Sequence, residues 1–187
     1  RRLAIFDLSE AGHQPMTSAD GRYVISYNGE IYNAEIMRRD PALADVSWNG
    51  HSDTEVIIES IARRGLDKTL WEINGMFAFV LWDKHKRVVH LVRDRLGIKP
   101  LFFARTSSRL IFGSEIKALR PAGLSCDIDP GSVAAYLRFG YVPAPFGIFY
   151  GLAKVMPGEV VSFDSNASLS RRSYWNLYDI AAEGLAN

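Results

Sequence analysis

The sequence is poor in the features that mark secreted, membrane-spanning or nucleic-acid-binding proteins. Cys126 is the single cysteine among 187 residues, which excludes an internal disulfide and is typical of a reducing compartment. No apolar run approaches the roughly 18 residues that span a bilayer. Lys and Arg are scattered and the formal net charge is +1, so there is no electrostatic basis for binding nucleic acid or a membrane surface. We expect a cytoplasmic protein.

Signatures of metal and phosphate sites are also missing from the sequence. His13, His51, His85 and His90 have no ligand spacing relative to one another or to Cys126. No glycine-rich loop joins a strand to a helix as in phosphate-binding motifs. Cys126 has no histidine beside it, so it is expected to be an inert small residue rather than a nucleophile. We predict that this chain binds no metal and no cofactor.

The residues that are present predict a globular α+β domain. The chain is 48% hydrophobic and 23% charged, and its length suits one domain with a substantial core. Four β-rich runs between residues 76 and 114 follow one another through short turns and predict an antiparallel meander. Runs such as "MFAFVL" are apolar on both faces, so each face of the sheet needs a covering layer. Helices are predicted for residues 33–39, 53–64, 66–74, 114–119 and 129–139.

The two ends of the chain carry different signals. The start, "RRLAIFDLSEAG", has no initiator Met and no signal-peptide character. It predicts a strand, "LAIFD", that is already under way, so we expect a segment upstream. Beyond Ser165 the chain becomes polar and predicts irregular structure. We therefore expect a domain over residues 1–164 and a linker over residues 165–187 toward another domain.

The stretch "SYNGEIYN" poses a question for secondary structure. A β-rich run ends in Asn28-Gly29, a pair that is typical of a hairpin turn, yet a helix-like segment follows instead of a returning strand. Taken singly, such polar residues have simple explanations. Asn28-Gly29 suits a turn, Arg2 a surface cation, and Asp53 a helix cap that stabilises by about 1 kcal/mol.

Considered together, several motifs resemble one known family. "YNGEIYN", "HSDTEVIIE", "INGMFAFVLWD", "RDRLGIKPLFF" and "GSEIKALRP", in this order and spacing, resemble the glutamine-hydrolysing domain of asparagine synthetase, a class II glutamine amidotransferase. "RRLAIFDLSEAGHQPM" is similar to a segment of the same family. The resemblance runs from Arg2 to about Asp164. It implies an N-terminal-nucleophile hydrolase fold, a four-layer αββα sandwich of two antiparallel sheets.

The resemblance also implies a set of site residues. In this family an N-terminal cysteine attacks the side-chain amide of glutamine, and Asn28 and Gly29 would supply the oxyanion hole, the latter through its backbone N–H. Arg2 would grip the α-carboxylate of glutamine through its planar fork, while Glu30 and Asp53 would hold the α-ammonium. The backbone of four consecutive residues would line the same pocket: Leu3, Ala4, Ile5 and Phe6.

Two parts of the family pattern are absent from the sequence. The nucleophilic cysteine would precede Arg2, so we expect the chain by itself to hydrolyse no glutamine. The ATP-dependent synthetase domain, which would bind ATP and Mg²⁺, would follow the linker as the partner of this domain. The function implied for the parent enzyme is hydrolysis of glutamine to glutamate and ammonia for the amidation of aspartate.

Other readings of the parent protein stay open. It could amidate a different carboxylate, for example in polysaccharide biosynthesis, because the acceptor is chosen in the absent domain. It could also lack the cysteine and serve as a silent glutamine-binding or docking module. The oligomeric state is open, a homodimer included. The charged run "RDRLGIKP" is interpreted as structural, with Asp94 and Arg95 paired around a tight turn.

Overall fold

The computed structural model describes residues 12–106, 109–166 and 168–186. The predicted strand "LAIFD" lies outside these residues. The larger sheet has the strand order β1-β2-β3-β4-β8-β9, and all its neighbouring strands are antiparallel. Its strands are β1 (Met16–Thr17), β2 (Tyr23–Ile31), β3 (Gly75–Asp83), β4 (Val88–Arg93), β8 (Glu159–Phe163) and β9 (Leu169–Ser173).

The smaller sheet has the antiparallel order β6-β5-β7. Its strands are β5 (Phe102–Arg105), β6 (Leu110–Gly113) and β7 (Leu152–Lys154). The predicted single meander is therefore wrong: β3 and β4 form a hairpin in one sheet, and β5 and β6 form a hairpin in the other. Short turns predict hairpins, but the turn at residues 94–101 carries the chain from one sheet to the other.

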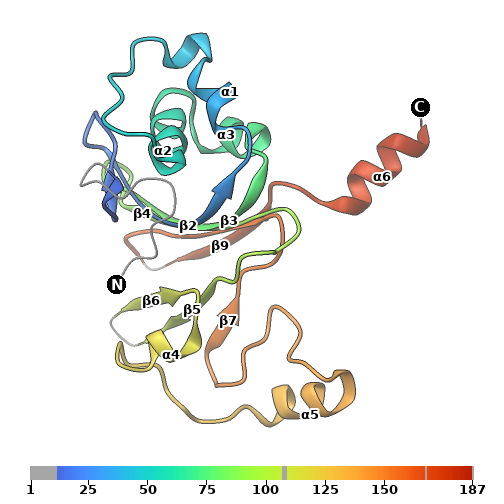
Figure 1. Cartoon of the computed structure of the whole chain (residues 1–187). Coiled ribbons are helices and arrows are strands. Elements are labelled where there is room, and N and C mark those ends of the chain that lie inside the picture. The colour runs from blue at the N-terminus through green and yellow to red at the C-terminus, as the bar shows by residue number, and fades with distance from the viewer. Residues whose placement is uncertain (1–11, 107–108, 167, 187) are drawn as a thin grey trace.

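The two sheets are stacked and helices cover their outer faces (Figure 1). Helices α1 (Ala34–Arg38), α2 (Asp53–Arg64) and α3 (Leu66–Glu72) and the 3-10 turn η2 (Pro41–Leu43) lie on one side of the larger sheet. Helices α4 (Ile116–Leu119) and α5 (Pro130–Phe139) lie beyond the smaller sheet. This arrangement is the predicted four-layer αββα sandwich.

Three buried clusters hold the layers together. Ile57, Ile61 and Leu70 from the helices pack on Phe77 and Phe79 of β3. A second cluster fills the space between the sheets, and a third lies between the smaller sheet and α4. Because both faces of the central strands are buried in this way, their sequences are apolar throughout rather than alternating.

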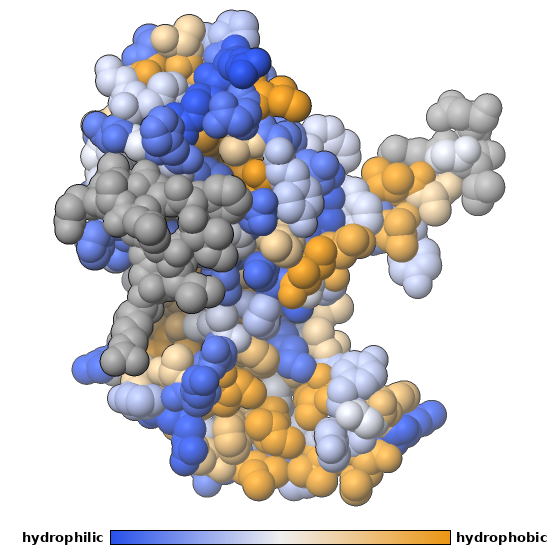
Figure 2. Space-filling model, in the orientation of Figure 1, coloured by the Kyte–Doolittle hydropathy of each residue, from blue (hydrophilic) through white to orange (hydrophobic). Residues whose placement is uncertain are grey.

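The predicted helices on the outer layer form for local reasons. The Ser52 side chain accepts a hydrogen bond from the N–H of Thr54 and caps α2, which ends at Gly65 with a φ of +86°. Asp129 caps α5 and is followed by Pro130 at the first helical position. Large exposed apolar side chains gather at α5 and the loop after it (Figure 2), among them Leu137, Tyr141 and Phe146. Such a surface is typical of contact with another domain or protein.

The Asn28-Gly29 pair lies inside β2 and does not form a hairpin turn. Asn28 is opposite Ala78 and Gly29 is opposite Phe77 in the ladder with β3. The strand continues to Ile31 before the chain enters α1. The prediction that the strand closes at this pair is therefore wrong, because pairing with β3 outweighs the turn preference of Asn-Gly.

Residues beyond Ser165 are more regular than their polar sequence predicts. β9 pairs with β8 along its whole length, and helix α6 (Leu177–Ala186) projects away from the sandwich (Figure 1). The guanidinium of Arg171 donates two hydrogen bonds to the carboxylate of Glu159, at 2.6 and 2.9 Å. This ion pair explains how a strand without an apolar face is held at the sheet edge. No helix among the described residues is long and apolar enough to cross a membrane.

Candidate functional site

The edge of β2 that faces away from β3 carries three backbone N–H groups in a row. Phe77, opposite Gly29, accepts a hydrogen bond from the N–H of Asp94 at 2.8 Å, and its own N–H donates to the Asp94 carboxylate at 3.2 Å. The backbone groups of Phe77 are thus directed away from β2. In an antiparallel ladder the N–H groups of Tyr27, Gly29 and Ile31 must then point to the opposite edge of β2.

The outer two of these N–H groups have acceptors. The N–H of Tyr27 donates to Oε1 of Gln14 at 2.7 Å, and the N–H of Ile31 donates to Oδ2 of Asp53 at 3.1 Å. β1 pairs only with Val24 and Ile25 and does not reach this part of the edge. Among the described residues, no acceptor is bonded to the N–H of Gly29. The backbone N–H of Gly29 thus lies between two N–H groups whose acceptors belong to the described residues.

Asp53 is brought to this edge by the start of α2. Besides the Ile31 N–H, its Oδ2 accepts a hydrogen bond from the hydroxyl of Tyr27 at 2.9 Å. Burial, together with the charge of Asp53, raises the pKa of Tyr27 above its ordinary value, so this hydroxyl stays protonated and remains a donor. Within the described part of the chain Oδ1 of Asp53 has no hydrogen-bond donor. The Oδ2 oxygen of Asp53 is thus held by two donors of β2.

The side chain of Asn28 points from β2 into the space between the two sheets. Its Nδ2 donates to Oγ of Ser114 at 3.0 Å, and both residues line a cavity of about 200 Å³. Apolar side chains line the same cavity, among them Ala78 and Val80 of β3 and Leu101 before β5. A small cavity thus combines polar groups, including the Asn28 amide, with apolar walls, as small-molecule sites do.

Gly29 is required by the close approach of two strands. A Cβ at Gly29, whose φ is +155°, would lie 2.2 Å from the carbonyl oxygen of Met76 and 2.6 Å from Cα of Phe77. Gly75 has the reciprocal relation, with a Cβ that would lie 2.2 Å from the carbonyl oxygen of Glu30. The close packing of the two strands therefore requires glycine at position 29, independently of the oxyanion role that the sequence predicts.

The structure describes some of the predicted site residues and not others. Asn28, Gly29 and Asp53 come together at residues 27–31 of β2. Glu30 is half-buried in the same strand, and side-chain alternation directs it to the face of Asn28 rather than to the face of Tyr27 and Asp53. The remaining predicted residues lie outside the described part of the chain: Arg2, Leu3, Ala4, Ile5 and Phe6.

The structure adds residues that the sequence did not single out. Gln14 accepts from β2 and donates to Thr54 through its Nε2 at 3.5 Å, and it lies in the quoted segment "RRLAIFDLSEAGHQPM". Tyr27 and Ser114 lie inside the quoted motifs "YNGEIYN" and "GSEIKALRP". Their position in motifs was a usable signal, but their contacts depend on the tertiary fold.

The charged run after β4 is structural, although its predicted ion pair does not form. Asp94 is 1% exposed, and its carboxylate accepts hydrogen bonds from the N–H groups of Leu96, Ile98 and Lys99 as well as Phe77. Arg95 instead donates to the carbonyl oxygen of Trp71 at 2.7 Å. The turn is organised by one buried carboxylate that binds backbone donors.

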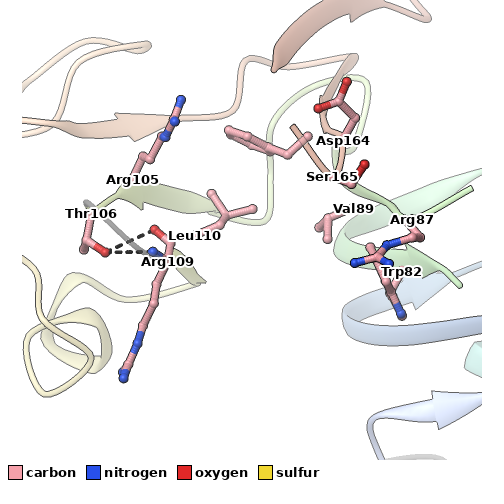
Figure 3. A pocket seen from close by; sticks show the side chains of 10 residues that line it. Trp82, Arg87, Val89, Arg105, Thr106, Arg109, Leu110, Asp164 and Ser165 are labelled. Carbon is pink, nitrogen blue, oxygen red and sulfur yellow. Dashed lines mark hydrogen bonds between the residues drawn. The ribbon is translucent and has the colours of Figure 1, made fainter. Parts of the chain in front are cut away.

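Another cavity, of about 270 Å³, lies farther along the β2–β3 ladder, and Figure 3 shows the residues that line it. Trp82 lies in its wall and pairs with Val24 in the ladder, whereas Asn28 pairs four residues away with Ala78. Arg87 and Arg109 stand on different hairpins around this cavity. Of the predicted site residues that the structure describes, none lines it. The described residues also contain no group of three His, Cys, Asp or Glu side chains that could hold a metal.

Comparisons with known proteins identify relatives of this chain. The family model for the glutamine amidotransferase domain matches residues 1–175. Asparagine synthetase [glutamine-hydrolyzing] 3 of Bacillus subtilis is 36% identical over 181 residues, which cover 95% of this chain and 29% of that protein. Amidase chyE of Penicillium rubens is 32% identical over 177 residues, 94% of this chain and 25% of that protein.

A solved structure shares the fold at lower identity. The glutamine phosphoribosylpyrophosphate amidotransferase from Bacillus subtilis aligns with a TM-score of 0.62 and 17% identity, over 92% of this chain and 34% of that chain. The fold is thus that of the N-terminal-nucleophile amidotransferases. The chain spans less than a third of the length of the two curated relatives described above.

Proposed function

Because the chain belongs to the glutamine amidotransferase domain family, we propose that it forms the glutamine site of an enzyme that hydrolyses glutamine and transfers the ammonia. The observation that carries this proposal is the edge of β2. There the Gly29 N–H, which has no acceptor among the described residues, follows Asn28 in the strand, and the Asp53 carboxylate is held by the N–H of Ile31 on the same edge.

The proposed roles divide between charge recognition and catalysis. The carboxylate of Asp53 binds the α-ammonium of glutamine, with Glu30 as a second anion near the strand. Arg2 binds the α-carboxylate through a bidentate contact, and the backbone groups of Leu3, Ala4, Ile5 and Phe6 complete the pocket. Because glutamine is a zwitterion, its ammonium group meets the two carboxylates and its carboxylate meets Arg2.

The chemical step would use a cysteine outside this chain. Its thiolate sulfur forms a bond to the side-chain carbonyl carbon of glutamine, and the carbonyl π electrons move onto oxygen. Asn28 Nδ2 and the Gly29 N–H donate to that oxyanion. When the tetrahedral intermediate collapses, the C–N bond breaks and the nitrogen leaves as ammonia after gaining a proton. Water then hydrolyses the thioester to glutamate and regenerates the thiol.

We propose asparagine synthesis as the activity of the complete protein. Identity of 36% to a glutamine-hydrolysing asparagine synthetase supports this reading. A synthetase domain that binds ATP and Mg²⁺ would then follow in the same polypeptide, with residues after the sandwich as the linker, and the enzyme would act in the cytoplasm.

A second candidate is an amidotransferase with another acceptor. Amidase chyE is 32% identical over nearly the same residues, so similarity in this domain does not select the acceptor. Incubation of the complete protein with glutamine, ATP and a series of carboxylates would separate the two candidates, because only the true acceptor yields an amide. A silent glutamine-binding module would bind glutamine and release no glutamate.

Two substitutions in the complete protein test the site. Asp53→Asn should raise the KM for glutamine about 10- to 100-fold, as expected for loss of one charge-assisted contact. Asn28→Ala should lower kcat for glutamine about 10²- to 10³-fold with less effect on KM. Synthesis driven by added ammonia should survive both changes, since it bypasses this site. Equal loss of glutamine- and ammonia-driven synthesis would show that these residues only maintain the fold.

A further inference from the structure

The Asn28 amide is anchored by a residue from the other sheet. Asn28 lies on β2 of the larger sheet, and Ser114 follows β6 of the smaller sheet, 86 residues later in the chain. Their hydrogen bond, Nδ2 to Oγ at 3.0 Å, is the sole side-chain hydrogen bond of Asn28 among the described residues. It closes the rim of the 200 Å³ cavity between the sheets.

An unanchored amide would be a poor oxyanion donor at this position. The side chain of Asn28 is exposed, so without a partner it would sample several rotamers. Stabilisation of a developing charge depends on donors that are already oriented when the charge appears. The Asn28 nitrogen carries two N–H groups. When one donates to Ser114, the nitrogen is held in place and the second N–H remains available to the substrate.

Ser114 is itself held in a defined position. It directly follows Gly113, which pairs with Phe102 in the smaller sheet, and it lies two residues before α4. Leu119 of α4 is buried at 1% exposure and packs within 3.2 Å of the Cβ position of Gly113. The backbone that carries the Ser114 hydroxyl is therefore held at the end of β6 by packing against α4. A side chain that orients another side chain needs such a rigid support.

We propose that Ser114 is a positioning residue that orients the Asn28 carboxamide toward the oxyanion formed from glutamine. This inference rests on the proposed function of Asn28. Ser114 acts through Asn28 and has no contact with the reacting atoms. The "GSEIKALRP" segment thereby acquires a role in glutamine hydrolysis, and the smaller sheet contributes to a site whose other described groups come from the larger sheet and α2.

The test is Ser114→Ala in the complete protein, with glutamine hydrolysis measured as glutamate release. Loss of the donor itself typically costs 10²- to 10³-fold, so loss of the group that orients it should lower kcat by about tenfold. The KM for glutamine should stay within about twofold, because the contact matters in the transition state. Ammonia-driven synthesis should be unchanged. Ser125→Ala is the matched control, since it removes a serine hydroxyl bonded to Asp127 at 2.7 Å in an exposed loop away from the site.

A double-mutant cycle with Asn28→Ala separates positioning from other effects. If Ser114 acts through Asn28, Ser114→Ala should cause no further loss of kcat in the Asn28→Ala background. A wild-type kcat for Ser114→Ala, or an undiminished tenfold loss in that background, would overturn the proposal. An unchanged kcat for Asn28→Ala alone would instead refute the oxyanion role of Asn28 and, with it, the proposed function of this site.

Discussion

At the scale of single residues, the contact between Gly29 and Gly75 shows how packing and chemistry demand the same residue. The atoms that a Cβ at either position would meet at 2.2 Å belong to the backbone of the neighbouring strand. Backbone cannot rotate away as a flexible side chain can. A substitution at Gly29 therefore tests the fold first, which is why the catalytic tests above change Asn28 instead.

Gly29→Ala should destabilise the domain by about 3 kcal/mol or more, because overpacking against backbone adds to an unfavourable φ. Gly21→Ala is the matched control: its φ is +73°, but a Cβ there meets nothing within 4 Å, so only the conformational cost of about 1–2 kcal/mol applies. The free energy of unfolding in urea compares the two variants. Similar losses for both would contradict the packing argument.

The residues of the site could be predicted from the sequence only in part. Asn28 and Asp53 were identified because they belong to motifs, and the structure places them at one stretch of β2. The anchoring roles of Gln14 and Ser114 could not be predicted, since each depends on a contact across at least 13 residues of chain. Local sequence carries propensities and motifs but does not show which side chains meet across the fold.

At the scale of elements, the turn after β4 is organised by Asp94. Its buried carboxylate accepts four backbone N–H groups, and an amide in its place would lose the charge and present one acceptor oxygen. Asp94→Asn should therefore cost about 2–4 kcal/mol of unfolding free energy, with donors left unsatisfied. Arg95→Gln, which removes the cation, should cost about 1 kcal/mol or less, as expected for loss of its hydrogen bond to Trp71. Equal destabilisation in both variants would favour the ion pair that the sequence suggested, and chemical denaturation distinguishes the outcomes.

Helices were easier to predict than the distribution of strands between sheets. Caps are local signals, because the side chains of Ser52 and Asp129 each accept a hydrogen bond from a backbone N–H within three residues. Asp53, suggested as a cap by the sequence, is instead the first residue of α2. The hairpins formed by β3–β4 and β5–β6 look alike in sequence, and their assignment to different sheets depends on the Asp94 turn. Likewise, Asn28-Gly29 resembles a turn in isolation but is paired with β3 in the fold. The sequence predicted segments well and their long-range pairing poorly.

At the scale of the whole molecule, the stability of the larger sheet depends on pH through Asp83. Arg22 at the start of β2 donates two hydrogen bonds to Asp83 at the end of β3, at 3.1 and 2.6 Å. Although burial alone would raise it, the hydrogen bonds from Arg22 and from backbone N–H groups lower the pKa of Asp83 from 3.8 to about 2. The folded state therefore stabilises the ionised carboxylate of Asp83 more than it stabilises the protonated carboxyl group.

A carboxyl group whose pKa is lower in the folded state than in the unfolded state stabilises the fold at pH values above its pKa in the unfolded state. This stabilisation is lost as the pH falls toward its pKa in the folded state. For Asp83 the window lies between 3.8 and about 2, and its contribution is about 2 kcal/mol. Asp83→Asn should be less stable at pH 6 and should lose less stability than the wild type between pH 4 and pH 2. Urea denaturation across this range measures both. Parallel pH curves for the two proteins would rule out Asp83 as the titrating group.

The C-terminal residues raise the question of where the folded unit ends. β9 lies beyond residue 164, the predicted limit of the domain, yet Arg171 pairs with Glu159, which is 8% exposed. The hydroxyl of Tyr174 donates a hydrogen bond to the carbonyl oxygen of Arg93 at 2.9 Å. In α6, by contrast, the described side chains are exposed. These contacts indicate that β9 belongs to the sandwich and α6 does not.

Two truncations of the 187-residue chain test this boundary. A chain that ends at residue 176 should retain its unfolding free energy to within about 0.5 kcal/mol, because the helix removed covers little of the sandwich. A chain that ends at residue 164 should lose about 3–5 kcal/mol, since Glu159 remains buried without its cation. Glu159→Gln in the shorter chain removes the stranded charge and should recover part of that loss. If both truncations proved equally stable, residues 165–176 would be linker, as their polar sequence predicts, and β9 would be an accessory strand.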